Sequence, residues 1–361
     1  MDFLVGGLVV SVSLLSGVFG FQPEMDGLQY EQLTKPIQLT QELGASQGVN
    51  RKASNSWWSS SFVHASDDHD YLILAHAALP NPNTSSVLFR GSILDINDTT
   101  YYRQVSWIFN QSSGAAPVQE GPLKIDSKNY GFVSVDPARP LGAMRTWCVS
   151  ESVEFNVTFA LSTPVILNGG VGTFPFGNEE TLEWSMPAGS TNGHLVRNGK
   201  SIDIDNARSL TWYDRQLMWP LAPMGGSAKA SWTWFELHVE KRKMSVWIWD
   251  TFDHQRFQFA TIRETPGIHQ VVAVTGFTPS RREWTSPISK STYPLDWDLS
   301  LADGTTLKIS SVRDDQELCN PEGTLATYEG YVTVTGRRGK DPISGYGLVE
   351  IVPANMIKRQ D

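Results

Sequence analysis

Short segments of alternating hydrophobic and polar residues, separated by turn residues, run through most of this 361-residue chain. Between residues 87 and 167 they are VLFRGSILDI, TTYYRQVSWIF, YGFVSVD, MRTWCVS and VEFNVTFAL. The same pattern continues from residue 231 to residue 352. Successive side chains of a strand point to opposite faces, so this pattern predicts half-buried strands, and no stretch of convincing length has the period of a helix. The chain is therefore expected to be all-β, as a sandwich or a barrel.

The chain is long for a single hydrophobic core, so two domains are expected. Residues 217–228 are rich in Gly and Pro and are interpreted as the crossing between them. The predicted division is an N-terminal β domain of residues 21–220 and a C-terminal β domain of residues 221–361. The two halves have the same kind of pattern, although no sequence repeat relates them.

Three further stretches complete the predicted organisation. Residues 56–66 and 71–79 are two strand-like runs joined by a polar turn, which is typical of a β-hairpin. Residues 21–50 lack periodicity and are expected to lie on the surface. Residues 168–190 are rich in Gly and Pro and are predicted to form a long irregular connection.

The polar turn brings together a cluster that invites a metal-site interpretation: His64, Asp67, Asp68, His69, Asp70 and His76. No spacing in this cluster matches a known ligand motif, and carboxylates in turns are usually solvated, so no metal is expected. The sequence also has no phosphate-binding loop, no Gly-x-Gly-x-x-Gly after a strand and no Cys-x-x-Cys. We therefore expect no cofactor.

The composition restricts the partners. A net charge of −9 argues against nucleic acid or an anionic membrane, because both require a basic surface. The chain contains 13 Trp, 16 Phe and 10 Tyr. Aromatic rings either pack a β-rich core or form flat walls around a ligand. Small apolar or aromatic molecules are thus the expected partners, and the oligomeric state is left open.

The N-terminus is predicted to carry a targeting signal. Residues 3–19 are apolar and end in small residues, so residues 1–20 are interpreted as a secretory signal peptide cleaved after Gly20. A short membrane anchor is the alternative. Four glycosylation acceptors follow at Asn83, Asn97, Asn110 and Asn156. These features predict a secreted or vesicular protein with no stable membrane insertion after the signal is removed.

The two cysteines, Cys148 and Cys319, are predicted to pair in such an oxidising compartment. Their disulfide would join the first half of the chain to the second and close a long loop. Two buried free thiols are the alternative.

The densest group of functional side chains lies in residues 193–216. Alternation places Trp212, Asp214 and Gln216 on one face of an extended chain and Tyr213 and Arg215 on the other. In the second half, one strand face carries Trp232, Trp234, Glu236 and His238. The next strand carries Trp247 and Trp249 on one face. These faces line either a barrel lumen or a surface covered by the other domain.

Residues 193–216, with the turn Asn198-Gly199-Lys200 and the ending SLTWYDRQ, resemble the hydroxyneurosporene synthase/kievitone hydratase-like family of lipocalin-like proteins. SWW at residues 56–58 agrees with this resemblance. So does TYEGYVTVTGRRGKDPISGYGLVEI at residues 327–351, a closing hairpin with a Tyr-Glu-Gly opening and a Gly-x-Gly-x-x-Glu end. Many relatives have Trp-Gly after the Gln, whereas this chain has Leu217, which predicts a different local pocket.

The resemblance implies two lipocalin-like β-barrel or sandwich domains with a ligand cavity at their junction. The family includes hydratases of isoprenoid chains and fungal pericyclases. This chain looks most similar to the hetero-Diels–Alderases of tropolonic sesquiterpene biosynthesis. They join a quinone methide, formed by dehydration of a hydroxymethyl precursor, to a terpene alkene.

Site residues follow from this resemblance and from the residue types. Asp214 is the candidate acid or base, Arg215 or Tyr213 would polarise a substrate oxygen, and His194 would shuttle protons. A structural ion pair of Asp214 with Arg215 is the alternative. The predicted substrate-binding residues are Trp57, Trp58, Trp212, Gln216, Trp232, Trp234, Trp247 and Trp249.

Three functions are compatible with these residues. The leading one is a cofactor-independent pericyclase, since a cycloaddition needs mainly two apolar partners held in a near-attack geometry with water excluded. The second is a kievitone hydratase-like hydratase or dehydratase, which needs a true general acid. The third is a non-catalytic lipocalin-like carrier of an apolar ligand.

Overall fold

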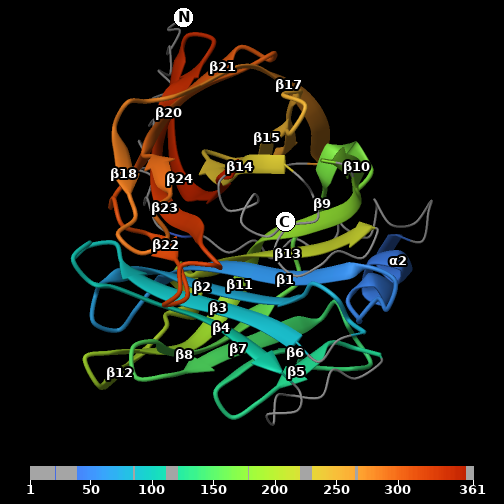
Figure 1. The fold of residues 1–361 in the computed structure, drawn as a ribbon, viewed down its shortest axis with the longest axis vertical. Coiled ribbons are helices and arrows are strands. Elements are labelled where there is room, and N and C mark those ends of the chain that lie inside the picture. Colours follow the sequence, from blue (N-terminus) through green and yellow to red (C-terminus); the bar gives the residue numbers. More distant parts are fainter. Residues whose placement is uncertain are drawn as a thin grey trace, which may run out of the picture.

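Two antiparallel β-sheets form most of the structure, a computed structural model that describes residues 21, 39–83, 86–110, 121–177, 179–219, 230–264 and 267–354. Figure 1 shows the first sheet below and the second above. Within these residues, the helical elements are α2 (Leu39–Ser46) and two single 3-10 turns, η2 (Asn168–Gly170) and η3 (Asn206–Arg208). The prediction of an all-β chain is confirmed.

The first sheet is a long curled sheet with the strand order β4-β3-β2-β1-β13-β11-β8-β7-β6-β5. Three short strands, β9, β10 and β12, pair only with the long strand β11. The strands are β1 (Ser54–His64), β2 (Asp70–Leu79), β3 (Ser86–Asp95), β4 (Tyr102–Asn110), β5 (Lys124–Asp126), β6 (Tyr130–Ser134), β7 (Ala143–Val149), β8 (Glu154–Ala160), β9 (Ile166–Leu167), β10 (Thr173–Phe176), β11 (Glu179–Arg197), β12 (Lys200–Asp203) and β13 (Leu210–Trp219).

The second sheet closes into a barrel of eight strands in the described residues, in the order β21-β20-β17-β16-β15-β14-β24-β23, because β23 also pairs with β21. Strand β22 adds to β23, and β18 and β19 form a separate hairpin. The strands are β14 (Ala230–Val239), β15 (Arg242–Thr251), β16 (Arg256–Glu264), β17 (Ile268–Pro279), β18 (Glu283–Thr285), β19 (Thr292–Pro294), β20 (Asp296–Leu301), β21 (Thr305–Ser311), β22 (Glu317–Leu318), β23 (Thr327–Arg338) and β24 (Asp341–Val352).

Three hydrophobic cores follow from the alternation of side chains. One lies inside the curl of the first sheet and includes Trp57 and Tyr213. A second fills the barrel, where Phe235 and Leu237 of β14 point inward. The third lies between the sheets and contains Trp58, with a larger set of aromatic residues from both. The barrel interior is thus a packed core, so the outer face of the barrel is the one that meets the first sheet.

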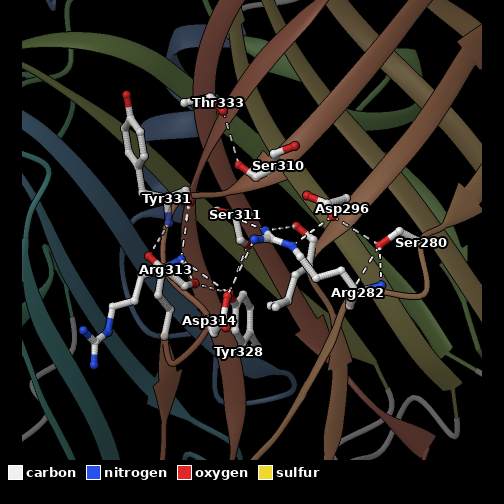
Figure 2. Close-up of polar contacts among 12 residues, drawn as sticks. Ser280, Arg282, Asp296, Ser310, Ser311, Arg313, Asp314, Tyr328, Tyr331 and Thr333 are labelled. Carbon is white, nitrogen blue, oxygen red and sulfur yellow. Dashed lines mark hydrogen bonds and ion pairs between the residues drawn. The ribbon is translucent and has the colours of Figure 1, made fainter. Parts of the chain in front are cut away.

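Polar contacts fasten the barrel where β20, β21 and β23 meet (Figure 2). The Arg282 guanidinium donates to the Asp296 carboxylate at 2.9 Å and to the Ser311 carbonyl at 2.9 Å. The Tyr328 hydroxyl lies 3.0 Å from Ser311 Oγ and donates to the Arg313 carbonyl at 3.0 Å. These contacts join the loop before β18 to the strands that close the barrel.

The element predictions were mostly right. The predicted hairpin of residues 56–79 is confirmed as β1 and β2, paired from Asn55 with Leu79 to His64 with Asp70. The irregular connection predicted for residues 168–190 is wrong, because residues 179–197 form the longest strand of the first sheet. That strand tolerates its Pro and Gly because the pairing with β13 shifts at a bulge between Met186 and Gly189.

The surface position predicted for residues 21–50 is also wrong for its described part. Gln47, just after α2, is fully buried, and its side chain accepts a hydrogen bond from the Tyr213 hydroxyl at 2.5 Å. The N–H of Trp57 donates to the Gln47 carbonyl at 2.9 Å. This segment is therefore part of the core of the first sheet. Most of the predicted crossing, namely residues 220–228, and the predicted signal peptide lie outside the described residues.

Candidate active site between the two sheets

Two rows of side chains face each other where the sheets meet. Strand register aligns one row across the first sheet, namely Arg90, His76, Trp58, Asp214 and Ser185. It aligns the other across the barrel, namely Glu329, Glu350, Trp234, Trp247 and Phe259. The rows touch where the rings of Trp58 and Trp234 meet edge to face, with centroids 5.2 Å apart. We call the residues between the sheets the intersheet layer.

Five carboxyl side chains enter this layer. Asp214, Glu183, Glu236 and Glu329 are buried, and Glu350 is half-buried. A buried carboxyl group normally has several hydrogen-bond partners or a paired cation, because burial penalises its charged form. Five such groups in an aromatic layer therefore make it the candidate functional site.

Four of these five carboxyl groups accept a hydrogen bond from a side chain fixed in the layer. The donors are three indole N–H groups and one hydroxyl: Trp212 to Asp214 at 2.8 Å, Trp58 to Glu329 at 2.8 Å, Trp232 to Glu350 at 2.6 Å and Ser60 to Glu236 at 2.6 Å. An indole is a rigid donor that cannot accept a proton. The tryptophans thus orient the acids as well as forming apolar walls.

Burial raises the pKa of these carboxyl groups. It raises the pKa of Asp214 to about 7, and hydrogen bonds from Ser185 and Trp212 partly offset the rise. Burial and the neighbouring Glu350 raise the pKa of Glu329 to about 8. Burial also raises the pKa of Glu183 and Glu236 well above the ordinary value. The layer therefore stores protons at neutral pH, and Asp214 is poised where it can release and regain one.

Several polar atoms of the layer have no hydrogen-bond partner in the described residues. They include Glu183 Oε2, Glu236 Oε2 and Glu329 Oε1. Arg90 approaches the last of these only to 3.7 Å. An unsatisfied buried polar group costs about 1–3 kcal/mol, so such atoms point to a molecule that completes them.

Burial and the nearby Arg90 together keep a neighbouring histidine neutral. Burial, aided by the Arg90 charge, lowers the pKa of His76 to about 3. The His76 ring is 2.9 Å from Ser56 Oγ and stays neutral at physiological pH. The positive charge of this end of the layer therefore resides on Arg90, next to the acids.

The structure separates the residues that the sequence had grouped. The predicted alternation is present: Trp212 and Asp214 enter the intersheet layer, whereas Tyr213 enters the core of the first sheet. Arg215 points the same way as Tyr213, and its guanidinium lies 4.3 Å from the centre of the Trp57 ring. Tyr213 and Arg215 therefore face away from the layer, which corrects their predicted part in catalysis.

Arg215 has a structural role instead. It is fully buried and donates to the carbonyls of Ser46, Gly48, Ser56 and Gln216 and to the side chain of Asn55, at 2.6–3.1 Å. Burial lowers the pKa of Arg215 to about 9. It does not pair with Asp214, so the alternative of a structural ion pair between the two is also wrong.

Two other predicted site residues lie elsewhere. His194 is half-buried on β11, where it pairs with Asn156 of β8 and Asp203 of β12, far along the strand from Ser185. Trp57 belongs to the first-sheet core rather than to the layer, which corrects its predicted contact with substrate. Gln216 is half-buried two residues beyond Asp214. The remaining predicted tryptophans all enter or border the layer, namely Trp58, Trp212, Trp232, Trp234, Trp247 and Trp249.

The predicted disulfide is not present. Cys148 and Cys319 are both buried free thiols, and burial raises the pKa of each to about 12. Cys148 packs in the first-sheet core, whereas Cys319 packs with Ala326 at the barrel and donates to the Asn320 carbonyl. The two thiols therefore belong to separate cores.

Sequence reasoning missed three acids and a cation of the layer, which are Glu183, Glu329, Glu350 and Arg90. A signal was present for two of them. Glu329 and Glu350 are charged residues inside hydrophobic strands, in the Tyr-Glu-Gly and Gly-x-Gly-x-x-Glu motifs of the closing hairpin. A charged residue at an inward position of an alternating strand is itself an indication of a site.

The remaining predictions concern glycosylation, metal binding and membrane insertion. Among the residues described, Asn83 and Asn97 are exposed and Asn156 is half-buried, and the Asn110 side chain is not described, so glycosylation stays a prediction. No group of three or more His, Cys, Asp or Glu is placed to hold a metal ion in the described chain. No helix of the described part is long and apolar enough to span a bilayer.

A closed, filled barrel packed against a curled sheet, with buried acids held by indole and hydroxyl donors between them, defines a two-sheet β protein. A family model described as AttH-like matches residues 68–353. The chain therefore belongs to the AttH-like family.

Named relatives cover nearly the whole chain. Kievitone hydratase of Fusarium solani subsp. phaseoli is 32% identical over 360 residues, with 98% of this chain and 97% of the relative covered. The dehydratase asqC of Emericella nidulans is 30% identical over 344 residues, with 92% and 94% covered. The crystal structure of kievitone hydratase from Nectria haematococca superposes with a TM-score of 0.75 at 34% identity, with 86% and 92% covered.

These comparisons confirm the resemblance found in the sequence. They also confirm the fold, because the crystal structure of the hydratase has the same architecture over most of this chain. Since its full-length relatives are a hydratase and a dehydratase, the chain is an enzyme.

Proposed function

We propose that this chain is a hydro-lyase, which adds water to or removes water from a small apolar molecule bound in the intersheet layer. The observation that carries the proposal is Asp214, a buried acid with a pKa near 7 in an aromatic layer. Its two long relatives, a hydratase and a dehydratase, support the same class of reaction.

One carboxyl group suffices for this reaction. In the dehydration direction, protonated Asp214 donates its proton to the substrate hydroxyl, the C–O bond breaks and water leaves. The Asp214 carboxylate then takes a proton from the neighbouring carbon, and the electrons of that C–H bond form the new double bond. Hydration is the reverse, so Asp214 is protonated before and after either reaction.

The surroundings of Asp214 fit this role. The Trp212 N–H holds one oxygen at 2.8 Å, and Trp58 lies beside Asp214 on the neighbouring strand. Burial raises the pKa of Asp214 to about 7, which keeps the proton on Asp214 up to neutral pH. The aromatic walls exclude bulk water, which strengthens these interactions and protects a reactive intermediate. The unpartnered carboxyl oxygens would bind the hydroxyl or the leaving water.

A cycloaddition remains the second candidate, favoured by the dense aromatic contacts of the layer. The ring centroids of Trp234 and Trp247 are 5.9 Å apart, and those of Trp247 and Phe176 are 5.2 Å apart. Dehydration of a hydroxymethyl aromatic compound would yield a quinone methide, and these walls would orient it against an alkene.

We further propose that the enzyme works in the secretory pathway of a fungal-type secondary metabolism, and that residue 220 divides its two domains.

The test uses the purified full chain with kievitone and, separately, with a hydroxymethyl-substituted phenol in ¹⁸O-labelled water. A hydratase incorporates ¹⁸O into kievitone, and a dehydratase releases water from the phenol. Asp214→Asn should lower kcat by at least about 100-fold. The matched control is Asp298→Asn, an exposed acid on β20, which should leave kcat unchanged.

Wild-type rates in Asp214→Asn would contradict the role of Asp214. Cycloadduct formation from a preformed quinone methide, at equal rates in both proteins, would favour the second candidate. Tight binding with no product from any substrate would indicate a carrier.

A further inference from the structure

The intersheet layer contains a second polar centre beyond the acids. His238 follows Glu236 by two residues on β14 and so shares its face. Its imidazole is only 3% exposed. The ring stacks on Tyr346 at 5.0 Å with an interplanar angle of 9°, and it meets the edges of Phe62 at 5.3 Å and Trp212 at 5.6 Å. The ring is therefore fixed in orientation by aromatic contacts on several sides.

Lys243 determines which nitrogen of this ring carries the hydrogen. Its Nζ lies 3.0 Å from His238 Nδ1, and an ammonium group can only donate. His238 Nδ1 must therefore accept, so the neutral ring carries its hydrogen on Nε2. Burial and the charges of Lys243 and Arg263 lower the pKa of His238, which keeps the ring neutral. His238 is thus a donor of one hydrogen bond in a known direction.

That hydrogen bond has no acceptor in the described residues. His238 Nε2 is buried and unpartnered, and so is Glu236 Oε2 on the same face. Leaving a buried N–H without an acceptor is costly, and the fixed ring cannot turn to find one. The acceptor is therefore to be sought outside the described residues.

We propose that His238 Nε2–H binds an oxygen acceptor of the substrate, a carbonyl or an aromatic ring oxygen conjugated to the carbon that gains or loses the hydroxyl. The inference rests on the proposed function, because it names the substrate class of the same site. His238 is a positioning residue that acts through this oxygen, and Lys243 fixes its tautomer. No bond forms or breaks at His238.

Trp212 connects the two centres. Its indole N–H donates to Asp214, and its ring also contacts the His238 ring. A flat molecule lying along Trp212 would therefore place one oxygen near Asp214 and another near His238. Drawing electrons toward the second oxygen would stabilise charge that develops when the hydroxyl departs. This arrangement selects an aromatic or conjugated ketone over a plain hydrocarbon.

The first experiment uses the wild-type protein with ¹⁵N-labelled histidine. The free protein should give a His238 signal of the neutral ring with hydrogen on Nε2. Acetophenone, an aromatic ring with a carbonyl oxygen, should shift this N–H signal, whereas ethylbenzene, which lacks the oxygen, should not. Hydrogen on Nδ1, or equal responses to the two probes, would overturn the inference, and so would binding of neither.

The second experiment compares variants by the dissociation constants of the same two probes. His238→Phe should weaken acetophenone binding about tenfold and leave ethylbenzene binding unchanged. His238→Gln, which restores an N–H near the position of Nε2, should recover part of the loss. His254→Phe, at an exposed histidine, is the matched control. An unchanged preference for acetophenone in His238→Phe would mean that an ordered water, not the substrate, occupies this nitrogen.

The outcomes separate the inference from the proposed function. If acetophenone depends on His238 but no substrate gains or loses water, the oxygen site stands and the hydro-lyase proposal falls. If water addition depends on Asp214 but not on His238, the hydro-lyase proposal stands and this inference falls.

Discussion

At the residue scale, Asp214 shows how surroundings decide the use of a common side chain. An exposed aspartate is ionised at neutral pH and cannot serve as an acid. Here burial in an aromatic layer holds its proton until about pH 7, and Trp212 keeps one oxygen in place. The neighbouring Arg215, one position further along the chain, instead donates to four backbone carbonyls and to the side chain of Asn55.

Activity should fall as pH rises through about 7, because Asp214 must be protonated to begin the reaction. The pKa of this acid is raised on folding from 3.8, so the folded state binds the proton more tightly than the unfolded state. Stability should therefore decrease between about pH 4 and pH 7, by about 2–4 kcal/mol. Asp214→Asn should remove the part of the pH dependence that Asp214 contributes, whereas the other buried acids keep theirs. Urea unfolding and kcat at several pH values measure both effects, and a pH-independent kcat would contradict them.

Arg215→Met should destabilise the protein by about 3–5 kcal/mol, because it leaves several buried carbonyl groups without a donor. The kcat of the folded fraction should change little, since Arg215 faces away from the layer. Chemical denaturation gives the first quantity, and active-site titration with kcat gives the second. A large loss of kcat without a loss of stability would indicate that Arg215 is a catalytic residue.

At the scale of elements, β14 and β24 approach each other unusually closely. A Cβ atom at Gly347 would lie 2.0 Å from the Glu236 carbonyl oxygen. This glycine therefore allows the closing hairpin to pair beside the strand that carries Glu236 and His238. The Gly-x-Gly-x-x-Glu motif has a physical reason: its glycine permits the pairing and its glutamate enters the layer.

Gly347→Ala should destabilise the protein by more than about 2 kcal/mol, because backbone atoms must move apart. It should also lower the affinity for substrate, since β14 would shift with Glu236 and His238. Gly276→Ala on β17 is the control, because its Cβ would meet only ordinary contacts at 3.5 Å. Equal thermal unfolding of the two variants would show that the close approach is not required.

Much of this element pattern was predictable from the sequence. The hairpin of β1 and β2 and the opposite faces of Trp212 and Tyr213 follow from alternation alone. Strand β11 was not, because its Pro187 and Gly189 resemble a loop and only the bulge explains them. It was also not predictable that Asp214 of the first sheet and Glu329 and Glu350 of the barrel enter the same layer. It depends on how two sheets pack, and alternation cannot show which face of a strand meets which partner.

At the scale of the whole molecule, the layer depends on both sheets. The barrel supplies Glu236 and Glu329, and the curled sheet supplies their donors Ser60 and Trp58, whereas Glu350 accepts from Trp232 of the barrel itself. The barrel alone therefore leaves Glu236 and Glu329 without these donors. The barrel has its own filled core, however, so it has the means to fold without the first sheet.

The isolated segment of residues 230–354 should therefore fold but self-associate, because it exposes the tryptophan-rich face that the first sheet covers. Circular dichroism and analytical ultracentrifugation measure the two properties. The acids should also return toward ordinary pKa values once they are solvated. A stable monomer would show that the exposed face does not cause self-association. An unfolded segment would show that the barrel needs the first sheet in order to fold.

Because the barrel interior is filled, alternate residues of one strand have different roles. Along β14, Phe235 and Leu237 pack the interior, whereas Trp234, Glu236 and His238 face the intersheet layer. A complete substitution scan of this strand should thus give two interleaved profiles, one in protein abundance and one in product formation. New substrates can then be sought by varying every second residue, with the hydrophobic interior left untouched.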